Sequence, residues 1–177
     1  MELSERLFNS ELSGLAWDFQ VSPTSCNNPS YYDEYIRFNA IGDYNKGMGV
    51  THVLIDTEND LLAGFITLRS TSLISAGSDN KKYVAPSLEI AELAVDARYE
   101  RKGIGSILIS IAIDMADELR KAHLGIRHIV VCADKSAVDF YKKCGFGELS
   151  SLYDVLHDGW NDEGCDAMYI TLPELNK

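Results

Sequence analysis

Residues 88–110 read LEIAELAVDARYERKGIGSILIS, and this stretch decides the fold. The run Ser87–Val95 is apolar enough to be a buried strand, and Asp96 closes it. A short charged loop over residues 97–102 then leads to Gly103-Ile104-Gly105, where an amphipathic helix starts. A strand, a glycine turn and a helix N-terminus in this order favour an anion site, because exposed backbone N–H groups and the helix dipole both attract negative charge. The natural candidate is the pyrophosphate of a nucleotide-like cofactor.

The composition is that of one globular domain without a basic surface. The chain has 177 residues, of which 46% are hydrophobic and 24% charged, and its net charge is -11. This charge disfavours nonspecific binding to nucleic acid or to an anionic membrane, and it favours a cationic substrate. We expect no signal peptide and no membrane span. The scattered cysteines predict thiols in a reducing cytoplasm and no metal site; they are Cys26, Cys132, Cys144 and Cys165.

Hydrophobic spacing and turn residues predict the other elements. Residues 70–86 are expected to form a long polar loop, and whether this loop closes over substrate is left open. The remaining expected elements are a first strand within 12–21, a helix over 31–47, a hairpin of strands 50–56 and 61–68, a helix over 103–122, a strand over 126–133, a short helix over 136–144, a strand from Phe146 and a final hairpin over 152–172. This order predicts a single α/β (α+β) domain with a mixed, mostly antiparallel sheet and helices on both faces.

Two segments together resemble a known family. They are LAVDARYERKGIGSILI at residues 93–109 and VVCADKSAVDFYKKCGF at residues 130–146, and their succession resembles the GNAT superfamily of acetyl-CoA-dependent N-acetyltransferases. The resemblance covers residues 87–149, which would be the cofactor core. Residues 32–68 are loosely similar to toxin acetyltransferases of toxin–antitoxin pairs. The resemblance implies a GNAT fold with splayed central strands and acetyl-CoA as the cofactor.

The family's pyrophosphate loop, Gln/Arg-x-x-Gly-x-Gly/Ala, falls on residues 100–105. Glu100 departs from this pattern, which has Gln or Arg at the first position. A carboxylate there would repel a pyrophosphate by on the order of 1 kcal/mol at 4 Å in water. Arg101 and Lys102 can offset that repulsion, although a solvated charge pair is the alternative for both. The family's central strand also pairs with pantetheine through its backbone. The implied cofactor-binding residues are Leu93, Ala94, Val95, Arg101, Lys102, Gly103, Ile104, Gly105, Ser106 and Phe140.

The resemblance also implies catalytic residues. Tyr141 lies where the family keeps its general acid, and a phenol can protonate the departing thiolate of CoA without ionising at neutral pH; the alternative is a packing tyrosine. Glu89 lies where histone-acetylating members keep a general base, and an apolar strand should raise the pKa of its carboxyl group. Glu92 is the second candidate, and either glutamate could instead form a structural ion pair. Asp134 replaces an asparagine that contacts pantetheine in many members. Cys144 is expected to pack, with direct transfer and no acyl-cysteine.

The leading hypothesis is therefore a cytoplasmic enzyme that moves acetyl from acetyl-CoA to a primary amine of a small molecule or peptide by direct attack. One alternative is a tRNA-acetylating toxin with an antitoxin partner, against which the net charge of -11 stands. The other is a non-catalytic acyl-CoA-binding module, which the departures at Glu100 and Asp134 favour. A homodimer is common in the family, and no membrane partner is expected. An acidic C-terminal group is either a solvated surface or a polycation site; it comprises Asp154, Asp158, Asp162, Glu163 and Asp166.

Overall fold

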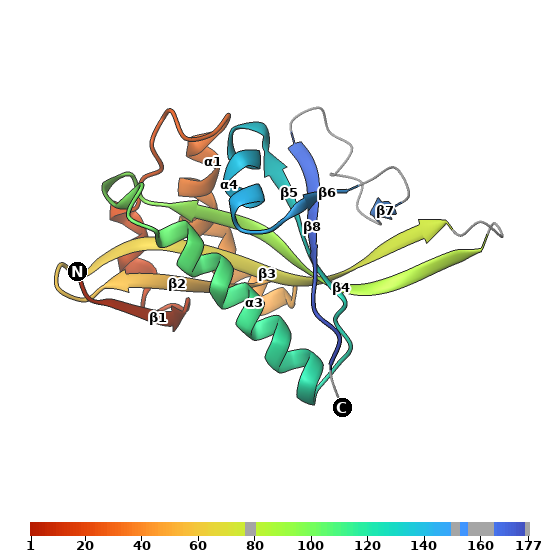
Figure 1. Cartoon of the computed structure of the whole chain (residues 1–177). Helices are drawn as coiled ribbons and strands as arrows, with labels where there is room; N and C mark the ends of the chain where they lie inside the picture. Colours follow the sequence, from red (N-terminus) through yellow and green to blue (C-terminus); the bar gives the residue numbers. More distant parts are fainter. Residues whose placement is uncertain (77–80, 150–152, 156–164, 176–177) are drawn as a thin grey trace. The chain divides into compact units, whose positions relative to one another are not determined.

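The computed structural model describes residues 1–76, 81–149, 153–155 and 165–175 (Figure 1). The chain divides into two compact units, one of residues 1–69 with 91–110 and the other of residues 70–90 with 111–177. The elements in chain order are β1 (Leu3–Leu7), η1 (Ser13–Asp18), α1 (Pro29–Glu34), η2 (Tyr35–Asn39), α2 (Ala40–Lys46), β2 (Val50–Asp56), β3 (Leu61–Ala76), β4 (Lys82–Val95), η3 (Ala97–Tyr99), α3 (Ile104–Ala122), β5 (His128–Asp134), η4 (Lys135–Ala137), α4 (Val138–Lys143), β6 (Gly147–Glu148), β7 (Tyr153–Val155) and β8 (Cys165–Thr171).

The strands form one mixed sheet in the order β1-β2-β3-β4-β5-β8-β6, with β7 on β3. The pair β4–β5 is parallel, and its ladder runs from Ser87 opposite His128 to Ile90 opposite Val131. The pairs β1–β2, β2–β3, β3–β7, β5–β8 and β6–β8 are antiparallel. The predicted α/β architecture with a mostly antiparallel sheet is therefore confirmed. Residues 93–95 lie on β4 beyond the end of its ladder with β5.

In the first unit, helices cover both faces of the sheet. A Cβ atom on Gly64 of β3 would lie only 2.9 Å from Ile104 and 3.1 Å from Leu108, which places α3 directly on that face. The next residue, Phe65, points to the opposite face, where its ring stacks on Tyr35 at 6.1 Å between centroids. Glycine at position 64 thus lets α3 approach the sheet closely.

The predicted first strand within residues 12–21 is wrong. Residues 13–18 form the 3₁₀ helix η1, and the first strand is β1, which pairs with β2. The apolar residues that pack into the core are spaced as on a helix, which explains the error; they are Leu12, Leu15, Ala16 and Phe19. The expected helix over 31–47 is confirmed as the continuous α1, η2 and α2, which ends at Gly47 in the left-handed region at φ 69°.

The predicted loop over 70–86 is wrong for its described part. Residues 70–76 extend β3 and residues 82–86 extend β4, so only the segment around 77–80, outside the described residues, separates the strands. Leu73 is fully buried and fixes the face of its strand. Three of the seven residues 70–76 are serines, so the segment lacks the apolar pattern by which a strand is predicted from sequence.

In the second unit, β5 and β8 pair along their full length, from His128 opposite Thr171 to Asp134 opposite Cys165. The expected C-terminal strand is thus confirmed as β8, but the expected hairpin is wrong, because β7 pairs with β3. The four-thiol prediction is also wrong, since Cys132 and Cys165 form a disulfide with Cα atoms 5.5 Å apart. Their diagonal placement on paired strands brings them within bonding range, which spacing along the chain could not show. No described helix is both long and apolar enough to cross a membrane.

Candidate active site

The loop between β4 and α3 turns sharply at two positions. Arg101 has φ 58° and Gly103 has φ 83°, both in the left-handed region. The N–H of Lys102 donates to the carbonyl of Tyr99 at 3.3 Å, and α3 then runs for 19 residues from Ile104. The first N–H groups of a helix have no intrahelical acceptor, and a left-handed residue beside right-handed ones turns successive N–H groups to one side. This loop can therefore cradle an anion with its backbone.

The two cationic side chains of the loop face solvent, whereas its glutamate is hydrogen-bonded to another segment. Arg101 and Lys102 are exposed, and Nζ of Lys102 lies 5.1 Å from the centroid of the Tyr99 ring. Glu100 accepts a hydrogen bond from Oγ of Ser25 at 2.5 Å. The hydroxyl thus holds the carboxylate toward the segment that precedes α1. This contact gives a structural reason for Glu100 in the loop, and no local pattern around either residue indicates that Ser25 would be its partner.

The side chain of Tyr99 holds the same loop in place through a hydrogen bond. Its hydroxyl donates to Oδ2 of Asp56 at 2.8 Å, and Asn59 donates to the same oxygen. Burial, followed by this hydrogen bond, raises the pKa of Tyr99 to about 12. Tyr99 therefore stays a phenol at neutral pH and fixes the loop to the end of β2. Ile104 is buried, so only its backbone is available to a ligand.

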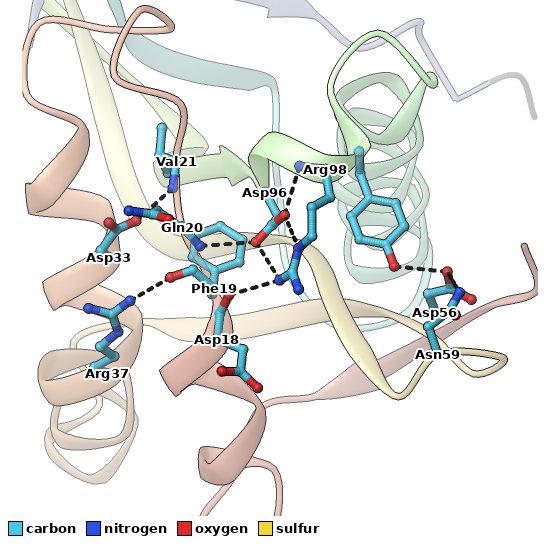
Figure 2. Close-up of polar contacts among 11 residues, drawn as sticks. Asp18, Phe19, Gln20, Val21, Asp33, Arg37, Asp56, Asn59, Asp96 and Arg98 are labelled. Carbon is cyan, nitrogen blue, oxygen red and sulfur yellow. Dashed lines mark hydrogen bonds and ion pairs between the residues drawn. The ribbon is translucent and has the colours of Figure 1, made fainter.

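The end of β4 is fixed by a polar network that sequence reasoning missed (Figure 2). Asp96 is only 1% exposed, and its carboxylate accepts hydrogen bonds from the N–H of Gln20 at 3.0 Å and from Nε of Arg98 at 2.7 Å. Arg98 also donates to the carbonyl of Asp18 at 2.8 Å. Burial alone would raise the pKa of Asp96, but the hydrogen bonds from Arg98 and Gln20 outweigh it and hold that pKa below its ordinary value.

The helical segment α1–η2 holds the other side of the same chain stretch (Figure 2). Arg37 donates to the carbonyl of Phe19 at 2.6 Å and to that of Ala16 at 3.1 Å. Asp33 accepts from the N–H of Val21 at 2.8 Å. Residues 16–21 are thus bound on one side by the helix and on the other by the end of β4. The network positions the strand end from which the loop before α3 departs.

The predicted platform residues lie at this strand end. Ala94 is buried in the core, whereas Leu93 and Val95 are half-buried. The N–H of Asp96 donates to the carbonyl of Ala63 on β3 at 3.0 Å. One residue before the platform, Glu92 accepts a hydrogen bond from the hydroxyl of Tyr31 at 2.6 Å. This contact places a carboxylate and a phenol of α1 beside the platform.

The second unit holds the two predicted catalytic residues. Tyr141 on α4 is 5% exposed, and its ring contacts Phe140 at 5.1 Å and Phe146 at 5.5 Å between centroids. Glu89 is 2% exposed and lies opposite Val130 in the β4–β5 ladder. Both side chains are therefore held in packed surroundings. Their catalytic roles stay predictions.

Two further sequence features are the aspartate at position 134 and the acidic C-terminal group. Asp134 caps η4, because its carboxylate accepts from the N–H and Oγ of Ser136 at 2.9 and 2.6 Å. A turn-capping carboxylate accounts for aspartate in place of asparagine. Of the acidic C-terminal group, Asp166 is exposed on β8, while the side chains of the other members fall outside the described residues. Within the described part of the chain, no His, Cys, Asp and Glu cluster is arranged to hold a metal ion.

A model described as the acetyltransferase (GNAT) family matches residues 12–146. The chain belongs to this family. The predicted family is thereby confirmed, and with it the predicted class, an acyltransferase of the kind that uses acetyl-CoA.

One curated relative is the streptothricin acetyltransferase of Streptomyces lavendulae, which is 28% identical over 123 residues. The match spans 70% of this chain but only 57% of the length of that protein. Its activity and substrate are therefore not transferred to this chain as findings.

Solved structures show the same fold. A structure described as a bacterial toxin has a TM-score of 0.75 at 20% identity and covers 96% of this chain and 90% of its own. The toxin AtaT in complex with acetyl-methionyl-tRNAfMet has a TM-score of 0.71 at 17% identity, with 96% and 95% covered. A point mutant of AtaT with acetyl-CoA and the C-terminus of the antitoxin AtaR has a TM-score of 0.68 at 18% identity, with 97% and 94% covered. At these identities the likeness establishes the fold alone.

Proposed function

We propose that the protein is an acetyl-CoA-dependent N-acetyltransferase whose acceptor is a primary amine on a cationic small molecule or peptide. The loop that carries Arg101 and Gly103 in the left-handed region, directly before the 19-residue α3, carries this proposal. Such a loop presents several N–H groups to one anion, and the helix dipole adds to their attraction. The pyrophosphate of acetyl-CoA is the anion that the family assignment suggests.

The first unit would bind the cofactor. When bound, acetyl-CoA supplies the thioester carbonyl carbon that the amine attacks. In this proposal the N–H groups of residues 101–106 bind the pyrophosphate, and the side chains of Arg101 and Lys102 add positive charge. The backbone of residues 93–95 pairs with pantetheine, and Phe140 stays a predicted cofactor-binding residue.

The second unit would move the protons. The amine nitrogen forms a bond to the carbonyl carbon while the carbon–sulfur bond breaks. Tyr141 donates its phenol proton to the departing sulfur, which is typically worth about 10²–10⁴ in rate. Glu89 takes the proton of the acceptor ammonium through a water molecule, since its carboxylate is buried. The nitrogen of the new amide loses its second proton to solvent, Glu89 releases its proton to solvent, and solvent returns a proton to Tyr141.

The experiment measures CoA release from acetyl-CoA across amines: polyamines, lysine-rich peptides, aminoglycosides, amino acids and charged tRNA. We expect turnover on cationic small amines or peptides, and we expect Tyr141→Phe to lower it at least about tenfold. Tyr44→Phe is the matched control, because Tyr44 is an exposed tyrosine on α2. Turnover that Tyr141→Phe leaves unchanged would refute the acid role, and no turnover together with a melting shift by acetyl-CoA would favour a binding module.

A second candidate is a toxin that acetylates charged tRNA and is held by an antitoxin. Its support is the fold that the chain shares with AtaT. One AtaT structure is a complex with acetyl-methionyl-tRNAfMet, and another is a complex with the C-terminus of the antitoxin AtaR. The net charge of -11 opposes it, because RNA binding usually requires a basic surface. Acetylation of charged tRNA that weakens steeply with salt, with no turnover of small amines, would favour the toxin.

We also propose the cytoplasm as the compartment, because a cytoplasmic pool of acetyl-CoA would supply the donor. The Cys132–Cys165 disulfide would then face thiol reductants, under which disulfides seldom persist. A homodimer remains part of the proposal, and sedimentation of the purified protein tests it.

A further inference from the structure

The carboxylate of Glu92 and the phenol of Tyr31 form a fixed pair on the face of β4 that α1 covers. The hydroxyl of Tyr31 donates to Oε1 of Glu92 at 2.6 Å, across 61 positions of sequence. Glu92 is half-buried, whereas Tyr31 is 42% exposed. The pair therefore borders solvent, and the hydrogen bond orients the carboxylate.

Aromatic rings gather at the same place. The ring of Tyr31 meets that of Tyr32 edge to face at 5.3 Å and lies 6.3 Å from that of Tyr35, between centroids. Tyr35 in turn stacks on Phe65 in the core, which gives the group a rigid base. Ring faces attract alkylammonium groups, and a carboxylate pairs with them through charge-assisted hydrogen bonds. Both features suit a cation.

The protonation state of this group also suits a cation. Burial, followed by the hydrogen bond to Glu92, raises the pKa of Tyr31 above its ordinary value. Tyr31 therefore remains a neutral phenol at any physiological pH. It orients the carboxylate without adding a second negative charge and without removing the first.

The location connects the pair with the reaction. Glu92 immediately precedes the platform residues 93–95, and successive strand residues are about 3.3 Å apart. A group held by Glu92 would therefore lie a few methylene groups from a thioester on that platform. The phosphates of an RNA acceptor would be repelled at the same place.

We propose that Tyr31, Tyr32 and Glu92 bind a second ammonium group of the acceptor, so that the substrate is an aliphatic amine carrying an additional positive charge. This inference rests on the proposed acetyltransferase function and names the substrate class of the same site. In this arrangement Glu92 determines specificity and does not remove the proton of the reacting amine.

The test compares matched acceptors, 1,4-diaminobutane against butylamine and 1,5-diaminopentane against pentylamine. The wild-type protein should prefer each diamine. Glu92→Gln should raise KM for the diamines by about 10- to 100-fold, as expected for loss of a charged partner, with little change in kcat or in the monoamine values. Glu92→Asp, which keeps the charge, should retain part of the preference. Glu34→Gln, an exposed glutamate of α1, is the matched control.

Three outcomes would overturn the inference: equal turnover of diamines and monoamines, an equal loss on both classes in Glu92→Gln, or turnover of charged tRNA alone. The second of these would indicate a general base. Absence of CoA release with every amine, and of any melting shift with acetyl-CoA, would instead refute the proposed function. Calorimetric binding of 1,4-diaminobutane to the protein saturated with CoA gives a readout that is independent of turnover, and Glu92→Gln should weaken this binding.

Discussion

Replacement of Arg98 by methionine should destabilise the protein in a way that depends on pH. Asp96 is 1% exposed, and the guanidinium of Arg98 donates to both of its carboxylate oxygens, at 2.7 and 2.8 Å. Methionine keeps much of the aliphatic stem and removes only the charge and the donors. The variant leaves a buried carboxylate with backbone donors alone.

The magnitude follows from the burial of the two partners. Removal of one partner of a fully buried ion pair costs about 3–5 kcal/mol. The side chain of Arg98 is 42% exposed, so solvent screens part of the interaction and we expect about 2–3 kcal/mol at pH 7. In the native protein the pKa of Asp96 is lowered, so this contribution is present above the ordinary aspartate pKa and is lost as pH falls through the folded value.

The assay is urea unfolding at pH 7 and again near pH 4. At the lower pH the difference between Arg98→Met and the wild type should shrink, because without Arg98 burial raises the pKa of Asp96 and protonation relieves the buried charge. Asp96→Asn and the double variant complete a cycle, in which the double variant should be more stable than the sum of the single losses predicts. A loss below about 1 kcal/mol at pH 7, or one that does not change with pH, would refute this reasoning.

Two further predictions concern the disulfide and the proposed anion-binding loop. The disulfide Cys132–Cys165 joins residues 33 positions apart in the chain, so its reduction should lower the free energy of unfolding by about 2–4 kcal/mol. Urea unfolding with and without reductant measures this loss. A Cys132→Ala, Cys165→Ala variant whose stability still responds to reductant would contradict the prediction. Arg101→Gly should relieve the left-handed backbone and stabilise the fold by about 1 kcal/mol while it weakens acetyl-CoA binding through loss of charge, and calorimetry with melting curves separates the two effects.

Local patterns predicted the strand, the loop and the helix of residues 88–110 well. The strand, the glycine turn and α3 follow one another within residues 88–110, so each is specified by its own spacing of apolar and glycine residues. The end of the helical segment 31–47 was likewise predictable from Gly47, which takes the left-handed conformation there. The prediction of the first strand failed for two reasons. Residues 12–19 bury their apolar side chains at helical spacing, and the actual first strand, β1, is an edge strand with little burial, so it shows no apolar alternation.

The contacts that shape the candidate site join residues far apart in the chain. Gln20 and Asp96 are separated by 76 positions, and Ser25 and Glu100 by 75. Nothing in either local sequence indicates the other partner, because such pairs arise only once the sheet has set the register of its strands. The disulfide shows the same limit, since Cys132 and Cys165 become neighbours through the pairing of β5 with β8.

The two glutamates that surround the platform share one explanation. Glu100 is held by the hydroxyl of Ser25 and Glu92 by that of Tyr31, so both donors come from the segment 25–31 at the start of α1. This one segment thus orients both carboxylates, that of Glu100 in the loop before α3 and that of Glu92 beside the platform. Neutral hydroxyls orient both side chains without adding positive charge, and a carboxylate repels a polyanionic acceptor and attracts a cationic one. The substrate preference that we infer therefore follows from the same short segment that reconciles Glu100 with an anion-binding loop.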